Sequence, residues 1–327
     1  MTTSTLFRGL AAAALSAIAM LGAMPASAQD FPTKPIRIIV PFPAGAITDT
    51  MARMVGQRLQ EKWSQPVVVE NRIGASGSIG AEYVYKAAPD GYTLLFTAQS
   101  VLVTNKLLNP KVGFEPDAFV PIGVTTRFNV AMMVNSKLPV ENLQQFIAYA
   151  KANPDKLNYA SAGAGSTSHL TGELFKAMSN TKIVQVPYQG IAPAMLGMLG
   201  GQVDVLFDNI TNALPYIKAG NVKVLAVGSE KRAASMPDTP TISDQLPGFS
   251  STLWIGFVAP PNTPAPLANR LSVAIAEALK NPESVKRIEA LAGMEAVGSD
   301  PATMASIMKS ERAQWAKVIK EQNITVE

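Results

Sequence analysis

Hydrophobic and polar positions follow a regular strand and helix rhythm from residue 36 onward. The β-branched run at residues 36–40 ends at Pro41 and predicts a strand. Residues 49–62 follow as a helix, because the apolar residues Met51, Met54, Val55 and Leu59 recur at helical spacing. Strands are predicted next at 67–70 and 93–97, with a helix at 80–88 between them. This order is typical of a parallel sheet covered by helices on both faces.

A second unit with the same rhythm begins near residue 130. Its predicted strands are 130–134, 157–160, 183–186, 203–207 and 222–227, and its helices are 143–152, 166–178, 192–199 and 214–219. Residues 229–251 contain three prolines and read as a loop, before a strand at 253–259 and helices at 266–279, 285–291 and 301–322. Two α/β units with a helical tail predict two lobes, and periodicity leaves open on which lobe the tail packs.

The first residues have the order of a secretory signal peptide. Arg8 precedes an apolar run at 10–21, and Ala26-Ser27-Ala28 has the small-x-small pattern of a cleavage site. The apolar run is short for a membrane-spanning helix. We therefore expect residues 1–28 to be removed after export and the mature chain to begin near Gln29.

Composition narrows the function classes. Apolar residues make up 47% and charged residues 16% of the 327 residues, which is typical of a folded globular chain. Cysteine is absent, which excludes cysteine nucleophiles, thiolate metal sites and disulfides. The net charge is only +4 with no dense run of basic residues, so nucleic acid is not an expected partner.

Two loops of small residues join a strand end to a helix start. The first contains Phe42, Ala44, Gly45, Ala46 and Ile47, with Thr48 or Asp49 expected to cap the next helix. Free amides at a helix start, with the helix dipole behind them, bind anions, and small residues allow an anion to approach. An ordinary tight turn explains this segment equally well. The segment has neither a Walker A nor a G-x-G-x-x-G order.

The second loop, residues 160–169, repeats this arrangement in the second unit. Gly165 precedes Ser166 and Thr167, one of which is expected to be the N-cap. Ligands of open α/β sheets bind at the carboxyl ends of strands, where both loops are predicted to lie. One loop from each lobe could hold the two ends of a dicarboxylate. We expect the Ser166 hydroxyl to donate to a ligand carboxylate, and its rival role is that of the helix cap.

Catalytic chemistry has weak support. His169 is the only histidine. Its position at a helix start favours a hydrogen bond to its own loop or to a ligand over a role as hydrolase base or zinc ligand. Asp204 and Asp208 flank a strand and would point to the same side of it, but they are poor candidates for a glycosidase pair. Asp208, at the strand end, is better interpreted as part of a turn that faces the cleft. Thr97, Gln99 and the polar strand end around them are a further candidate cleft border, and Trp254 is expected in the core.

The whole mature chain resembles the Bug-type extracytoplasmic solute receptors of tripartite tricarboxylate transporters. The motifs that carry the resemblance are residues 31–36 (FPTKPI), 40–45 (VPFPAG), 69–72 (VENR), 88–92 (APDGY), 159–163 (YASAG), 165–166, 169–170, 186–188 (VPY), 201–204 (GQVD) and 225–227 (LAV). So many motifs in the same order make the match specific.

The resemblance implies an α/β fold of the type II periplasmic-binding-protein class, with two lobes around a ligand cleft. Lobe one would comprise residues 29–128 and 253–327, and lobe two residues 129–252. It also implies a small carboxylate ligand held by backbone amides, hydroxyls and waters, without a cofactor or metal. Ala46 and Ile47 replace a second glycine and a small residue of the family pattern, which favours a ligand with an aromatic or aliphatic body.

The expected biology follows from the same resemblance. The chain would be a monomeric periplasmic receptor that hands its ligand to membrane transporter subunits, and it would not be an enzyme. Coupling to a sensor kinase is an alternative that the residues do not separate from transport. A periplasmic α/β hydrolase is the remaining alternative, disfavoured by the single His169 and the lack of cysteine.

Overall fold

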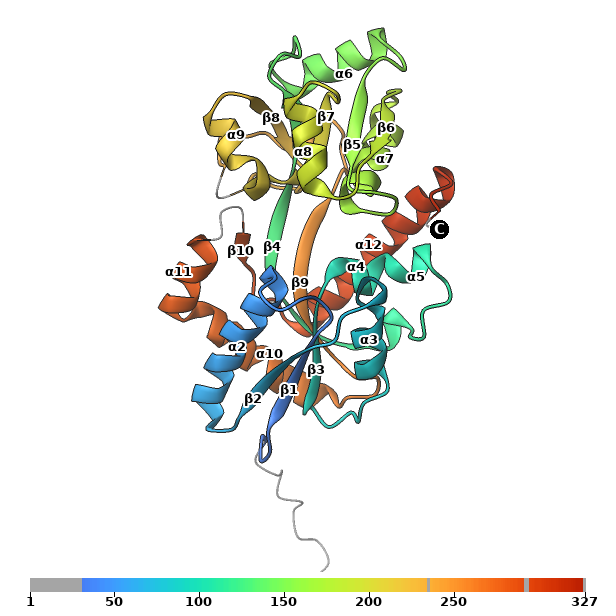
Figure 1. Cartoon of the computed structure of the whole chain (residues 1–327). Helices are drawn as coiled ribbons and strands as arrows, with labels where there is room; N and C mark the ends of the chain where they lie inside the picture. The colour runs from blue at the N-terminus through green and yellow to red at the C-terminus, as the bar shows by residue number, and fades with distance from the viewer. Residues whose placement is uncertain (1–30, 234–235, 291–293, 326–327) are drawn as a thin grey trace, which may run out of the picture.

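The computed structural model describes residues 31–233, 236–290 and 294–325 of the chain (Figure 1). The predicted signal peptide at residues 1–28 lies outside these ranges. Within them, none of the helices combines the length and the apolar character needed to cross a membrane.

One part of the molecule is built on a sheet in which β1 (Ile36–Val40) is an inner strand. The strand order is β2 (Val67–Asn71), β1, β3 (Thr93–Ala98), β9 (Thr252–Ala259) and β4 (Val120–Asn135), with β10 (Met294–Ala296) also paired to β4. β1 is parallel to β2 and β3, whereas β9 is antiparallel to β3 and β4. The buried face of α2 (Ile47–Trp63) includes Met51, Met54, Val55 and Leu59, as the helical spacing predicts.

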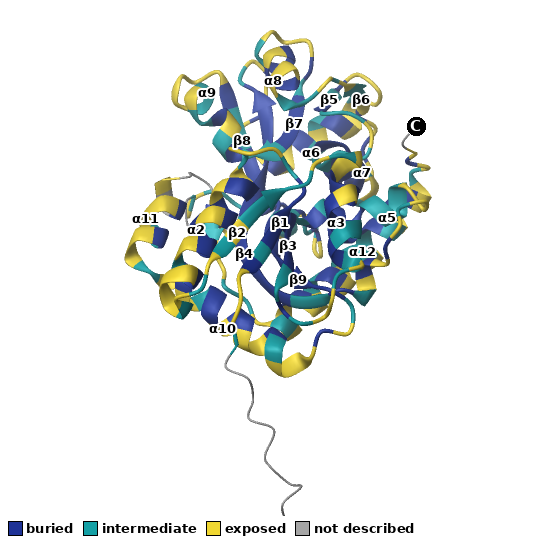
Figure 2. Cartoon of the chain, turned by 60° about the horizontal axis from the view of Figure 1, so that its bottom comes forward, coloured by how far each residue is buried: buried dark blue, intermediate teal, exposed yellow. Residues whose placement is uncertain are grey.

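The second part contains a smaller sheet above the first in Figure 1. β7 (Val205–Asn209) and β8 (Val222–Val227) flank the C-terminal half of β4, and β5 (Asn158–Ser161) and β6 (Val184–Pro187) continue beyond β7. Its helices are α6 (Leu143–Ala152), α7 (Thr167–Ser179), α8 (Ile191–Leu199) and α9 (Leu214–Lys218). Figure 2 shows that the strands of both parts are largely buried while the outer helix faces are exposed.

The chain connects the two parts through β4 and β9. β4 pairs with β9 as far as Asn129, and from Val130 it pairs with β7 and β8 instead. The chain leaves the second part after β8 and returns to the first part at β9. Where it leaves, the Gly228 amide donates to the Val130 carbonyl of β4 at 2.6 Å, and where it returns, the Ser251 amide donates to the Gly228 carbonyl at 2.8 Å. Both crossings therefore pass through one narrow region between the sheets.

The last helices return to the first part. α10 (Ala265–Lys280) packs on β4 and α2, and α11 (Pro282–Ala290) precedes β10. α12 (Pro301–Glu321) contacts β4, α4 (Gln99–Val103) and α5 (Asn105–Leu108), and it also contacts α7 of the second part. The helical tail, whose location periodicity left open, thus lies against both parts.

The structure corrects several predicted boundaries. β4 is 16 residues long and starts ten residues before the predicted strand at 130–134, because the same strand serves both sheets. α3 is Ser78–Tyr85, two to three residues earlier than predicted. Residues 99 and 100, predicted as a polar strand end, begin the short helix α4. The three-residue strand β10 was not predicted, since Met294–Ala296 is too short for a periodic signal.

Candidate functional site

The loop before α7 is fixed by its own side chains. Ser166 is the N-cap of α7, as predicted, and its hydroxyl oxygen accepts from the His169 amide at 3.3 Å. The same hydroxyl donates its hydrogen to the Gly163 carbonyl at 2.7 Å. Gly163 and Gly165 have φ of +109° and +70°, a left-handed conformation that favours glycine. Within the described chain, the amides of Thr167 and Ser168 donate to no protein acceptor, as expected for a first helical turn.

His169 bonds its own loop, as the sequence predicted. Its Nδ1 accepts from the Gly165 amide at 3.0 Å, and the residue is buried. Burial lowers the pKa of the imidazole, an effect that the charge of nearby Lys176 reinforces and the charge of Glu173 opposes. The ring is therefore neutral and braces the loop, and its Nδ1 is not available to deprotonate a serine hydroxyl.

The opposing wall is the start of α4. Gln99 is buried and directs its amide nitrogen to a carboxylate oxygen of Glu311 on α12, at 3.0 Å. Thr104, immediately after α4, donates its hydroxyl hydrogen to the Ser100 carbonyl at 3.2 Å. These three polar residues come from the first part of the molecule and face the loop before α7.

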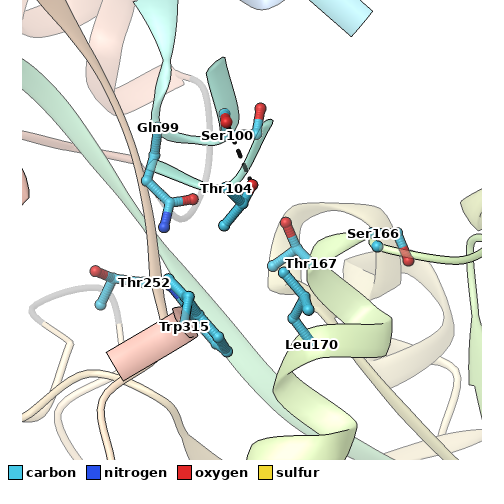
Figure 3. Close-up of a pocket in the computed structure, with 9 residues that line it drawn as sticks. Gln99, Ser100, Thr104, Ser166, Thr167, Leu170, Thr252 and Trp315 are labelled. Atoms are coloured by element: carbon cyan, nitrogen blue, oxygen red, sulfur yellow. Dashed lines mark hydrogen bonds between the residues drawn. The ribbon is translucent and has the colours of Figure 1, made fainter. Parts of the chain in front are cut away.

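A cavity of about 170 Å³ separates these two walls (Figure 3). Its lining residues are Gln99, Ser100, Thr104, Gly165, Ser166, Thr167, Leu170, Thr252 and Trp315. They come from α4 and the residue after it, the loop before α7, the first turn of α7, the crossing strand β9 and α12. None of the nine is charged, and most offer a hydroxyl, an amide or a backbone group. Such a lining suits a small polar solute that is recognised by hydrogen bonds.

A larger cavity of about 420 Å³ shares Ser100, Thr104, Gly165 and Ser166 with the first. Its remaining lining residues are Ala75, Ser76, Ser78, Asn105, Leu108, Asn109, Val112 and Ala164. Ala75 and Ser76 both have positive φ, between Gly74 and Gly77, which is a strained backbone for residues with a Cβ. Sequence reasoning missed this loop. The signal was present, since Gly74–Ser78 also joins a strand end to a helix start through small residues.

The first predicted loop has a different arrangement from the one expected. α2 begins at Ile47 with Ala46 as N-cap, and no side chain caps it, so the prediction of Thr48 or Asp49 as the cap was wrong. Asp49 lies in the first turn and reaches back to accept from the Gly45 amide at 2.9 Å. Its two carboxylate oxygens also accept from Asn71 at 2.9 Å and Arg53 at 3.0 Å.

The Asp49 carboxylate is therefore committed to holding the loop. Burial opposes its ionisation, but the hydrogen bonds from Arg53, the Gly45 amide and Asn71 outweigh burial and lower its pKa. Phe42, Ala44, Gly45, Ala46, Ile47, Thr48 and Asp49 line neither of the two cavities. Ile47 is exposed at the start of α2, with 38% of its surface accessible.

The other candidate residues line neither of the two cavities. Thr97 is fully buried, and its hydroxyl has no partner among the described residues. Asp208 is the penultimate residue of β7 and accepts from Asn212 at 2.7 Å, while burial raises its pKa to about 6 against the hydrogen bonds it receives. Asp204 precedes β7 and accepts from the Asn158 amide at 2.9 Å, about four strand residues or ~13 Å away from Asp208. Trp254 is a core residue, as predicted.

Comparisons with known proteins agree with this architecture. The family model described as "Tripartite tricarboxylate transporter family receptor" (TctC) matches residues 51–324. Protein BugT of Bordetella pertussis strain Tohama I is 35% identical over 302 residues, which cover 91% of this chain and 92% of BugT.

Two solved structures extend the comparison. The Rhodopseudomonas palustris protein MatC with bound malate shares 32% identity at a TM-score of 0.68, covering 88% of this chain and all of that one. The R. palustris protein Rpa4515 with adipate shares 34% identity at a TM-score of 0.72, covering 90% of this chain and 99% of that one. The α/β fold expected from the sequence, that of the periplasmic solute-binding proteins, is confirmed by these similarities.

Proposed function

Because this chain belongs to the tripartite tricarboxylate transporter receptor family, we propose that it captures a small carboxylate in the cavity between α4 and α7. The family and the structural neighbours are solute-binding receptors rather than enzymes, and receptors of this family are periplasmic and work with transporter subunits. In our proposal the ligand is a dicarboxylate with an aromatic or aliphatic body, and a monomeric receptor delivers it to the membrane subunits.

The observation that carries the proposal is the uncharged, hydrogen-bonding cavity between two helix starts. Thr167 lines it and stands at the first position of α7, where unpaired amides and the helix dipole favour an anion. No lysine or arginine lines it, so a carboxylate there would be held by amides and hydroxyls. Malate in MatC and adipate in Rpa4515 are both dicarboxylates, which supports the same ligand class here.

Lobe closure is part of the proposal. We assign residues 29–128 with 253–327 to lobe one and residues 129–252 to lobe two. The change of pairing partners of β4 between Asn129 and Val130 supports this division. The two walls of the cavity then come from different lobes. Closure about the two crossing segments would bring the first loop, from Phe42 to Asp49, closer to the ligand.

The test is calorimetric titration of the mature protein with succinate, glutarate, adipate, citrate and benzoate. We expect saturable binding of one molecule per chain for at least one dicarboxylate, and mass spectrometry should recover it unchanged after prolonged incubation. Consumption of the bound ligand, or failure of every carboxylate to bind, would overturn the proposal.

A charge variant ties the binding to this cavity. Thr167→Glu places a carboxylate in the cavity wall at a helix position that tolerates acidic residues, so it should abolish carboxylate binding without unfolding the protein. Ala302→Glu is the matched control, because Ala302 is exposed in the first turn of α12 and lines neither cavity. Equal binding by the two variants would place the ligand elsewhere.

A further inference from the structure

Three polar side chains that line the smaller cavity already donate a hydrogen inside the protein. Gln99 donates its amide hydrogen to Glu311, Thr104 donates to the Ser100 carbonyl, and Ser166 donates to the Gly163 carbonyl. Each of these side chains has thereby committed a donor inside the protein. A hydroxyl has only one hydrogen, so Thr104 and Ser166 are left with acceptor capacity alone.

Gln99 has the most firmly fixed orientation. The Glu311 oxygen that accepts from Gln99 also accepts from the indole N–H of Trp254, at 2.9 Å. An indole nitrogen can only donate, so this oxygen is an acceptor, and the Gln99 amide nitrogen donates to the same oxygen. Figure 3 shows the consequence, with the amide oxygen of Gln99 directed toward the space between Thr104 and Thr167.

The anchor of this arrangement is itself well held. Glu311 projects from α12, and Trp254 stands on β9 with 1% of its surface exposed. Burial raises the pKa of Glu311 to about 7, while the hydrogen bonds from Trp254 and Gln99 and the charge of Arg127 on β4 limit that rise. Elements of the crossing region and the C-terminal helix therefore fix an acceptor in the cavity wall.

A carboxylate cannot satisfy an acceptor. If a carboxylate group lies at the start of α7, the Gln99 oxygen faces the remainder of the ligand and needs a hydrogen-bond donor there, since an acceptor opposite an acceptor is unpaired. An ammonium group would supply the donor but would bring a positive charge into cavities that no carboxylate side chain lines. A neutral hydroxyl avoids that cost.

We infer that Gln99 determines specificity for hydroxylated carboxylates, and that Glu311 is the positioning residue that keeps its amide oxygen toward the ligand. This inference rests on the proposed capture of a carboxylate in this cavity and names the substrate class more closely. The ligand class is a dicarboxylate with a hydroxyl group on its carbon chain.

The test compares ligands that differ by one hydroxyl. Dissociation constants are measured by calorimetry for succinate against D- and L-malate, and for glutarate against D- and L-2-hydroxyglutarate, with L-aspartate as the ammonium probe. The wild-type protein should bind one hydroxylated enantiomer about 2- to 12-fold more tightly than its parent, the range for one neutral hydrogen bond. L-Aspartate should bind less tightly than the preferred malate.

Variants assign the preference to these residues. Gln99→Met keeps the side-chain length and removes the acceptor, so the preference ratio should fall to about 1 while the parent dicarboxylate still binds. Glu311→Gln retains an oxygen for Gln99 and Trp254 and should preserve the ratio, whereas Glu311→Met should lose it. Gln57→Met, on the exposed face of α2, is the control and should leave the ratio unchanged.

The outcomes separate this inference from the proposed function. A wild-type ratio near 1, or a ratio that survives Gln99→Met, overturns the specificity role even though carboxylates bind. Tighter binding of L-aspartate than of either malate overturns the choice of a hydroxyl. If no dicarboxylate binds the wild-type protein, the proposed function itself fails. Should Glu311→Met not fold, Gln99→Met and Glu311→Gln still decide.

Discussion

Replacing Ser166 with alanine separates the two roles that its hydroxyl could have. In the structure the hydroxyl caps α7 by accepting from His169 and donates its hydrogen to Gly163. Loss of a serine cap typically costs about 1 kcal/mol of stability. For a protein of this size, that corresponds to a fall of about 2–4 °C in the unfolding temperature of the ligand-free protein.

The expected effect on ligand affinity is small. The hydroxyl hydrogen is already donated inside the loop, and the amides of the first turn of α7 remain in the variant. We therefore expect Ser166→Ala to weaken carboxylate binding less than about tenfold. Removal of a hydrogen bond to a charged group would instead lower the affinity by about 10- to 150-fold. Differential scanning calorimetry gives the first quantity and titration calorimetry the second.

Asn142→Ala is the matched control. Asn142 caps α6 through the same kind of bond, accepting from the Gln145 amide at 2.9 Å, and it lines neither cavity. It should lower the unfolding temperature by a similar amount and leave affinity unchanged. A 10- to 150-fold loss of affinity in Ser166→Ala, with an unchanged unfolding temperature, would refute our reasoning and show that the hydroxyl donates to the ligand.

Three further predictions concern pH, specificity and shape. Burial raises the pKa of Glu311 from 4.5 to about 7. The resulting contribution to folding stability, at most about 3 kcal/mol, is fully present below pH 4.5 and is lost as pH rises through 7. The unfolding temperature should thus fall between pH 5 and pH 8, and Glu311→Gln should flatten the fall; an equal slope in the variant would assign it to other groups. Ile47→Gly should change the ranking of carboxylates by about tenfold if closure brings Ile47 onto the ligand, since its burial contributes roughly 1.5–3 kcal/mol, and an unchanged ranking would remove it from the site. Small-angle scattering should show a smaller radius of gyration with saturating ligand, and an unchanged radius would indicate a rigid cleft.

Local patterns in the sequence determined the elements and one wall of the candidate site. The apolar spacing of Met51, Met54, Val55 and Leu59 predicted the buried face of α2, because such a face depends only on helical geometry. Ser166 as N-cap and His169 as a loop brace were predictable for the same reason, since both bonds span three or four residues.

Only the tertiary structure decided which of these pieces meet. Glu311 lies 212 residues from Gln99 and carried no signal of its own, because a helical glutamate is usually a solvated residue. Packing α12 against β4, α4 and α7 brings Glu311 to Gln99 and fixes the amide of Gln99. The same packing adds Trp315 and Thr252 to the cavity lining. Asp49, in the loop predicted to bind an anion, instead accepts hydrogen bonds from Gly45, Arg53 and Asn71. Contacts between residues so far apart depend on how sheets and helices stack, which no local pattern encodes.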